Sequence, residues 1–386
     1  MPASFLHGVE VVEIDDGTRP IRTVKSSVIG IVGTAPDADP QKFPLNTPVL
    51  IAGSRTEAAP LGATGTLLPS INGIFDQCGA LVVVVRVAAD DDVNTEIANV
   101  VGGVDADTGH YTGVQALLSA ESVLGVTPRL LIAPGYTSQV VVVPALIAVA
   151  ERLRAIAIVD GPSTNDAEVL AYRKQFGSPR VYLVDPAVRV FDTELAAETV
   201  QPVSARAAGV IAKTDNDYGF WASPSNKIIN GLVGTERPID YTPGDANARA
   251  NLLNEHEITT VIQQNGYLLW GNRTLSPDPK WAFLCVRRTA DIINDSLLRA
   301  HMWAVDRGIT KTYLHDVAAG VNAYLRDLKQ LGAILGGECW ADPEKNPPEN
   351  IAAGRARFDF DFTPPTPGER LTFASRVTNK YLEDVL

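Results

Sequence analysis

The five histidines of the chain are the side chains best suited to acid–base chemistry, yet none has the neighbours that such chemistry needs. A serine hydrolase places a histidine beside a serine and a carboxylate, and no G-x-S-x-G turn carries a serine here. "NEHEI" (residues 254–258) is not the H-E-x-x-H pattern of a zinc protease. The five histidines are His7, His110, His256, His301 and His315, and none lies in a recognisable nucleophile or base motif. His301 and His315 lie on or near apolar helices, and we interpret them as packed or surface side chains.

The glycine-rich and acidic stretches do not match known nucleotide-binding, metal-binding or paired-carboxylate catalytic sites. "GIVGTAP" (residues 30–36) has two glycines and a helix-breaking proline, and "GATGT" (residues 62–66) lacks the Lys-Ser/Thr of a phosphate loop. "ADDDV" (residues 89–93) has oxygen ligands for calcium, but acidic residues after a strand are usually a solvated loop. Asp359 and Asp361 share one strand face, which we read as its wet side. We therefore expect no catalytic residue, cofactor or metal, and no enzyme activity.

The composition narrows the choice of partner. The chain has 386 residues, 45% hydrophobic and 20% charged, and a net charge of −12, which argues against nucleic acid and anionic membrane surfaces. No apolar run is long enough for a transmembrane helix, and no secretory leader is visible. Cys78, Cys285 and Cys339 are widely spaced, which indicates reduced thiols in a protein made in the cytoplasm.

One segment is basic against this acidic background. Residues 280–330 contain eight Lys or Arg and five Asp, and no Glu. The plain interpretation is two solvated helix faces. The alternative is a basic surface that docks an acidic protein partner.

Apolar patterning predicts the elements that hold these residues. β-rich apolar runs predict buried strands, and helical segments alternate with them, which is typical of a parallel sheet covered by helices. The predicted strands are residues 26–36, 81–90, 129–135, 155–162 and 180–186. The predicted helices are residues 113–125, from Thr137 or Ser138 to 154, from Ser163 or Thr164 to 176, and one beginning near Ser204.

The C-terminal third has a different pattern. Residues 283–307 and 316–331 predict two helices, the second with Val317, Val321, Tyr324, Leu325, Leu328 and Leu331 on one face. "RFDFDF" then alternates strictly, which predicts a strand with Phe358, Phe360 and Phe362 toward the core. "TPPTPG" (residues 363–368) predicts a stiff connector.

Both ends of the chain look like strands without a partner. The opening "HGVEVVEIDDGTRPI" (residues 7–21) offers Val9, Val11, Val12 and Ile14, and the ending offers Leu371, Phe373 and Val377. A lone strand leaves its backbone groups unpaired and is marginal in water. We therefore predict a β-arm at each end of the chain, held by a partner that the adjacent sequence does not supply.

Several long motifs resemble the contractile tail sheath proteins of phages and phage-tail-like bacteriocins. They are "FLHGVEVVEIDDGTRPI", "VVGGVDADTGHYTGVQALL" (residues 100–118), "PRLLIAPGYTS", "SARAAGVIAKTDNDYGFWASPSN" (residues 204–226) and "RFDFDFTPPTPGERLTFASRVTNKYLEDVL". The resemblance covers nearly the whole chain in order. Its moderate length is most similar to the sheaths of R-type pyocins and P2-like myophages.

The resemblance implies an α/β fold: a central parallel-rich, subtilisin-like sheet with flanking helices, an α+β C-terminal domain and two β-arms. The implied divisions are residues 1–24, 25–105, 106–275, 276–362 and 363–386. It further implies a helical homo-polymer around an inner tube, with baseplate and tail terminator partners, which assembles in the bacterial cytoplasm and contracts. The two arms would exchange strands with other copies of the chain, with hinges at residues 15–22 and 363–368. For the tube contact we predict Arg299, Arg326 and Lys329. The alternatives are a non-catalytic α/β binding module, or an enzyme on the same scaffold.

Overall fold

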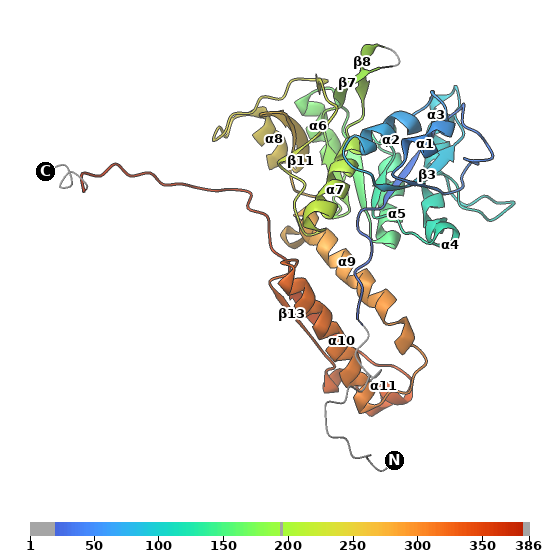
Figure 1. Ribbon diagram of the computed structural model, residues 1–386, viewed down its shortest axis with the longest axis vertical. Helices are drawn as coiled ribbons and strands as arrows, with labels where there is room; N and C mark the ends of the chain where they lie inside the picture. Colours follow the sequence, from blue (N-terminus) through green and yellow to red (C-terminus); the bar gives the residue numbers. More distant parts are fainter. Residues whose placement is uncertain (1–19, 194–195, 381–386) are drawn as a thin grey trace, which may run out of the picture.

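The structure, a computed structural model, describes residues 20–193 and 196–380 and divides into a body and a C-terminal domain (Figure 1). Within these ranges the body is built on a nine-stranded sheet in the order β2-β3-β1-β4-β5-β6-β11-β12-β9. Its strands are β1 (Ile29–Thr34), β2 (Val49–Ala52), β3 (Leu81–Val87), β4 (Leu130–Ile132), β5 (Ile156–Asp160), β6 (Val181–Val184), β9 (Lys227–Ile228), β11 (Ile258–Gln263) and β12 (Tyr267–Trp270). The six central strands are parallel, and the antiparallel pairings lie at the two edges.

The predicted fold class is confirmed, because helices cover both faces of this sheet. One face packs on α2 and α7, and the other on α3, α5 and α6. The central strands are almost wholly buried, which explains why their sequences are rich in apolar and β-branched residues. The helices of the body are α1 (Arg55–Ala58), α2 (Leu67–Phe75), α3 (Val93–Val101), α4 (Ala120–Leu124), α5 (Val142–Leu153), α6 (Asp166–Arg173), α7 (Ser204–Tyr218) and α8 (Arg249–Glu255).

Three short elements complete the body. β7 (Val188–Asp192) pairs with β8 (Ala197–Gln201) and β10 (Gly234–Thr235), and β7 and β8 project at the end away from the C-terminal domain (Figure 1). Short 3₁₀ turns lie at η1 (Ala59–Leu61), η2 (Gly113–Ser119) and η3 (Pro279–Trp281).

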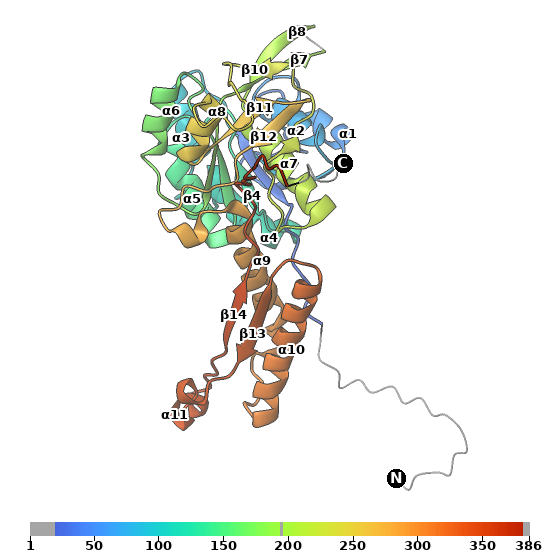
Figure 2. The same ribbon diagram turned by 90° about the vertical axis from the view of Figure 1, so that its left-hand side faces the viewer.

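The C-terminal domain consists of two long helices and a two-stranded sheet below the body (Figure 2). Its elements are α9 (Leu284–Ala300), η4 (Met302–Ala304), α10 (Lys311–Gln330), β13 (Gly336–Trp340), η5 (Pro343–Lys345), α11 (Pro348–Ala352) and β14 (Asp359–Thr363). The core of this domain is separate from the cores of the body and includes Ile293, Tyr324, Leu325 and Leu328.

Several predicted boundaries were wrong for local reasons. The helix predicted over residues 113–125 is mostly the 3₁₀ turn η2 followed by the short α4, although Gly125 ends it in the left-handed region at φ 69°. α5 starts at Val142 without a side-chain cap. α6 is capped by Asn165, whose side chain accepts from the Glu168 amide, and not by Ser163 or Thr164.

The two C-terminal helices also differ from their predicted ranges. α10 begins at Lys311, five residues before the predicted Asp316, because the Thr310 hydroxyl caps its first turn. Leu331 lies beyond the helix and is 63% exposed, so it does not belong to the buried face. α9 stops at Ala300, and the predicted remainder to residue 307 contains η4 and a loop.

Two glycines hold the loop of the "VVGGVDADTGHYTG" motif. Gly102 and Gly113 both have positive φ, at 61° and 58°. A Cβ on Gly102 would lie 2.0 Å from the Thr112 carbonyl oxygen, and one on Gly113 would lie 2.4 Å from the Val100 oxygen. The motif therefore requires glycine at these positions because two backbone segments cross in contact there.

Candidate subunit interface

The sheet of the C-terminal domain has one covered edge and one open edge. β13 and β14 are antiparallel, with Cys339 directly opposite Phe360 and Gly337 opposite Phe362. β13 lies next to α10, and β14 lies on the far side of β13 (Figure 2). The rings of Phe358, Phe360 and Phe362 are half-buried and pack against the core of the domain.

Asn322 of α10 determines which edge is covered. Its side-chain amide donates to the Cys339 carbonyl at 2.8 Å and accepts from the Cys339 amide at 2.8 Å. Both backbone groups of Cys339 therefore point away from β14, so Cys339 and Phe360 form a non-hydrogen-bonded pair. The edge of β13 is thus occupied at this position by a side chain of α10.

The same alternation leaves the outer edge of β14 open. Because hydrogen-bonded and non-hydrogen-bonded pairs alternate, the amides and carbonyls of Phe360 and Phe362 point away from β13. Within the described ranges, no neighbouring element bonds to these four groups. An exposed edge of this kind is a template for another strand.

The C-terminal arm (residues 364–380) extends away from the body and the C-terminal domain (Figure 1). It forms no strand within the described ranges, and its large apolar side chains are exposed: Leu371 is 79% exposed, Phe373 91%, and Val377 fully. At its base, the Arg273 guanidinium donates to both oxygens of Glu369 at 2.7 and 2.6 Å. The predicted hinge therefore lies between two fixed points, β14, which includes Thr363, and this ion pair.

The predicted N-terminal strand residues Val9, Val11, Val12 and Ile14 lie outside the described residues. The N-terminal segment (residues 20–28) leads into β1 and packs on the C-terminal domain. There the Val24 amide donates to the Ser296 hydroxyl at 3.1 Å, and the Thr23 and Tyr324 hydroxyls lie 3.1 Å apart. Of the predicted hinge at residues 15–22, the described part is held by Ile21, which packs on the same core.

Ion pairs along α9 fix the C-terminal domain to the body. Arg288 donates to both oxygens of Asp215 at 2.6 Å, and the two side chains are 4% and 1% exposed. Asp291 pairs with Arg180 of the body as well as with Arg287. These contacts join the two parts through a buried seam, so we expect them to move as one rigid unit.

The predicted tube-contact residues occupy two different settings. Arg299 pairs with Glu121 and Asp295 of its own chain, which explains part of the basic segment as structural. Arg326 and Lys329 lie on the exposed face of α10 and have no ion pair within the described ranges. The tube contact stays a prediction, and Arg326 and Lys329 are its stronger members.

Two buried aspartates lie where an α/β enzyme would place catalytic groups, at the carboxyl ends of β5 and β6. Asp160 accepts from the Ser204 amide and hydroxyl at 2.7 and 2.5 Å and thereby holds the start of α7. Burial raises the pKa of Asp160 to about 6, against the hydrogen bonds that favour its charged form. Asp185 accepts from Arg237 at 2.5 Å and from the Ser163 amide. Both carboxylates therefore have structural partners: Asp160 holds the start of α7, and Asp185 holds the loop at Ser163 and Arg237.

Among the described residues, no helix is long and apolar enough to span a membrane. The same residues contain no cluster of three or more His, Cys, Asp or Glu with the geometry of a metal site.

Family models match most of the chain in three consecutive pieces. The Tail sheath protein Gp18 domain III N-terminal region matches residues 26–87, the Phage tail sheath protein central domain residues 109–275, and the Phage tail sheath C-terminal domain residues 276–378.

Relatives match over their full lengths. A prophage major tail sheath protein of Pseudomonas aeruginosa strain UCBPP-PA14 is 45% identical, covering 99% of each chain. The tail sheath protein of Escherichia phage P2 is 39% identical, covering 100% of this chain and 98% of that protein.

Solved structures share the fold at lower identity. The helical sheath of the anti-feeding prophage in its contracted state gives a TM-score of 0.73 at 20% identity, covering 98% of this chain and 100% of that one. The contracted sheath complex of the extracellular contractile injection system PVC gives 0.68 at 19% identity, covering 99% and 100%. The full-length relatives are tail sheath proteins, which makes this chain a structural component of a phage tail or tail-like particle, and not an enzyme. The chain belongs to the phage tail sheath protein family.

Proposed function

We propose that the chain polymerises into a helical sheath around an inner tube and that strand exchange between copies links the polymer. This proposal rests on the open outer edge of β14 and on the adjoining C-terminal arm, which forms no strand within the described ranges and exposes its large apolar side chains. The C-terminal arm of one copy and residues 9–14 of another add to this edge, in the order β13-β14-arm-arm. The resulting four-stranded sheet covers Leu371, Phe373 and Val377.

Main-chain hydrogen bonding accounts for a strong joint. Four outward groups on Phe360 and Phe362 give up to four bonds, each contributing a net of about 0.5–1.5 kcal/mol, so about 2–6 kcal/mol per joint. Burial of the apolar arm residues adds to this. The joint persists while body-to-body contacts change, because the chain on either side of each strand supplies the hinge.

We further propose that the sheath contracts and drives its tube through a target envelope, with the energy stored at assembly. The relatives named as contracted sheaths share this fold, and a solved anti-feeding prophage baseplate contains a chain of the same fold at TM-score 0.72, which supports a baseplate partner. The tube and tail terminator as partners, and assembly in the bacterial cytoplasm, rest on family membership alone.

Electron microscopy of the expressed protein tests polymerisation, and deletion of residues 1–20 tests strand exchange. We expect sheath-like cylinders from the full chain. The deleted chain should keep a cooperative unfolding transition but form no cylinders. Intact cylinders from the deleted chain would contradict strand exchange, and their absence from the full chain would contradict polymerisation.

The tube contact has its own test. Arg326→Glu with Lys329→Glu should leave the fold and sheath polymerisation intact but prevent co-assembly with the inner tube protein, because both side chains are exposed on α10. Co-sedimentation of sheath with tube measures this. Normal co-assembly of the double variant would discard the proposed contact.

A further inference from the structure

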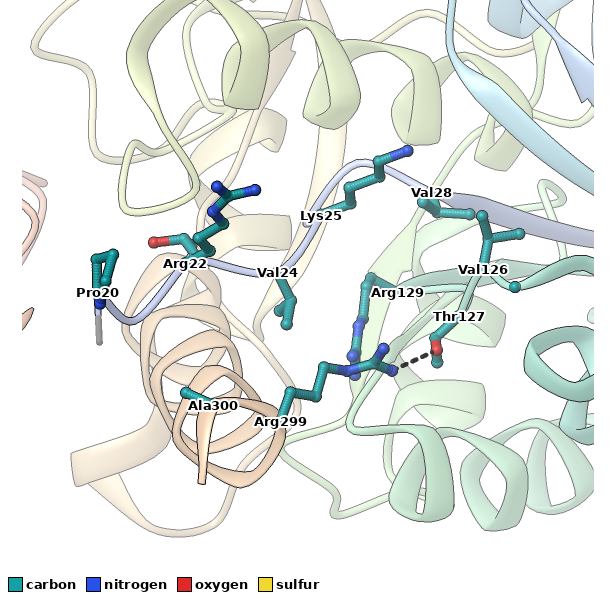
Figure 3. Close-up of a pocket in the computed structure, with 12 residues that line it drawn as sticks. Pro20, Arg22, Val24, Lys25, Val28, Val126, Thr127, Arg129, Arg299 and Ala300 are labelled. Atoms are coloured by element: carbon teal, nitrogen blue, oxygen red, sulfur yellow. Dashed lines mark hydrogen bonds between the residues drawn. The ribbon is translucent and has the colours of Figure 1, made fainter. Parts of the chain in front are cut away.

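A cavity of about 470 Å³ lies where the N-terminal segment passes between the end of α9 and the chain leading into β4 (Figure 3). Its lining includes four cationic residues from three parts of the chain, and the charged ends of Arg22 and Lys25 point away from those of Arg129 and Arg299 (Figure 3). Arg22 and Lys25 come from the N-terminal segment, Arg129 from the start of β4, and Arg299 from α9. Apolar side chains such as Val24 and Val28 form the rest of the wall.

The charges around this cavity do not balance. Asp295 pairs with Arg129, Arg154 and Arg299, and Glu121 pairs with Arg299. Arg22 and Lys25 are exposed and make no ion pair with any residue in the described ranges. The cations gathered here (Arg22, Lys25, Arg129, Arg154, Arg299) exceed the carboxylates (Asp295, Glu121) by three, within a chain of net charge −12.

Arg129 adds an unmet hydrogen-bonding need. Its side chain is 4% exposed, and its two terminal nitrogens donate to Asp295 and to the Leu153 carbonyl. Its Nε atom is buried and has no partner in the described structure. A buried guanidinium with an unused donor favours an additional acceptor.

We propose that this cavity receives a carboxylate side chain from a second copy of this chain, which rests on the proposed polymerisation. Charge favours a copy as the partner, because each subunit is strongly acidic and exposes aspartates such as Asp90, Asp91 and Asp107. A helical polymer repeats one heterologous contact at every subunit, so each copy both offers a carboxylate and receives one. The incoming carboxylate accepts from Lys25, which lines the cavity, and reduces the excess of positive charge from three to two.

The cavity lies at the base of the N-terminal arm. Residues 20–28 form one wall, so an occupant is held against the base of the N-terminal arm. Because the same segment bonds to Ser296 and Tyr324, occupancy links the arm base, α9 and a neighbouring copy. The contact would hold the arm base in place within the polymer.

Zero-length crosslinking tests the occupant directly. A carbodiimide joins the Lys25 amine only to a carboxylate in contact with it. Sheath assembled from equal amounts of ¹⁴N- and ¹⁵N-labelled chains should give mixed-isotope crosslinked peptides containing Lys25, and the unassembled chain should not. Crosslinks within one copy only, crosslinks to the tube protein, or cylinders without any Lys25 crosslink would each overturn the proposal while polymerisation stands. If no cylinders form, polymerisation itself fails and this proposal falls with it.

Charge reversal gives a second readout with a matched control. Arg22→Glu with Lys25→Glu should raise the critical concentration for polymerisation at least ten-fold, and the two Gln replacements should raise it less. Lys42→Glu with Lys174→Glu alters two exposed cations away from the cavity and gives the same net charge of about −16. It should assemble like wild type. Equal effects of the two reversals would overturn the proposal, because overall charge would then explain both.

Discussion

Phe373 separates the stability of the subunit from the strength of the joint between subunits. Its side chain is 91% exposed in the single chain, so Phe373→Ala removes no intramolecular packing. In a strand-exchanged sheet the ring is buried, and losing that burial costs about 2 kcal/mol. Since each 1.4 kcal/mol is about a factor of ten in an equilibrium constant, the critical concentration for polymerisation should rise about thirty-fold.

Urea unfolding of the unassembled chain and sedimentation of the polymer measure the two quantities separately. We expect the free energy of unfolding of Phe373→Ala to stay within about 0.5 kcal/mol of wild type, as for other exposed positions. Thr372→Ala is the matched control, because Thr372 is adjacent and exposed but on the opposite strand face. The reasoning is refuted if Phe373→Ala polymerises at the wild-type concentration, or if it destabilises the single chain by more than about 1 kcal/mol.

Three further predictions concern the fold that carries the arms. Arg288→Met should lower the free energy of unfolding by about 3–5 kcal/mol, because it leaves Asp215 buried and unpaired. Adding Asp215→Leu should recover most of this loss in a urea titration. A double variant as unstable as Arg288→Met would contradict the prediction. Gly102→Ala should lower the free energy of unfolding by at least about 2 kcal/mol, because the added Cβ would meet a carbonyl oxygen. Gly103→Ala adds its Cβ in open space and should lower it by less than about 1 kcal/mol. Equal melting temperatures of the two variants would contradict this. The pKa of Asp160 is raised to about 6 in the folded state, so the native chain binds more protons than the unfolded chain between about pH 4 and 6. The contribution of Asp160 to the free energy of unfolding therefore falls by about 3 kcal/mol as the pH rises through that window. Asp160→Asn should flatten that part of the pH–stability curve, and an unchanged slope would argue against it.

Five strands of the body, β1, β3, β4, β5 and β6, were predictable because each is almost wholly buried and rich in apolar residues. "LVVVVRV" and "IAIVD" could hardly form anything else between turn residues. The remaining strands were not predicted, because they are short or partly exposed, as in β2, β7, β8 and β9, or lie in a stretch without a clear strand boundary, as in β11 and β12. Helix starts were less predictable, since several nearby residues can each cap a helix. Asn165 displaced the two candidates before it because its side chain reaches the Glu168 amide.

The interface was only partly visible in the sequence. The exposed alternation of the C-terminal arm could be read directly, but the single open edge of β14 depends on Asn322, an ordinary polar residue in a helix. The basic segment also carries a pairing signal in its sequence: Arg287, Asp291, Asp295 and Arg299 are spaced four apart, which predicts ion pairs along one helix face. That helix face also packs against Arg129 and Arg180 of the body, a contact that the local sequence pattern does not predict.

A high-resolution electron cryo-microscopy map of the assembled sheath tests the central claim most directly. We predict a four-stranded sheet in which β14 has β13 on one side and, on its outer edge, two strands from other copies, one of them containing Leu371 and Phe373. Backbone bonds should reach Phe360 and Phe362, and Asn322 should still cover Cys339. A C-terminal arm that folds back on its own sheet, or an incoming strand on the edge of β13, would contradict the account.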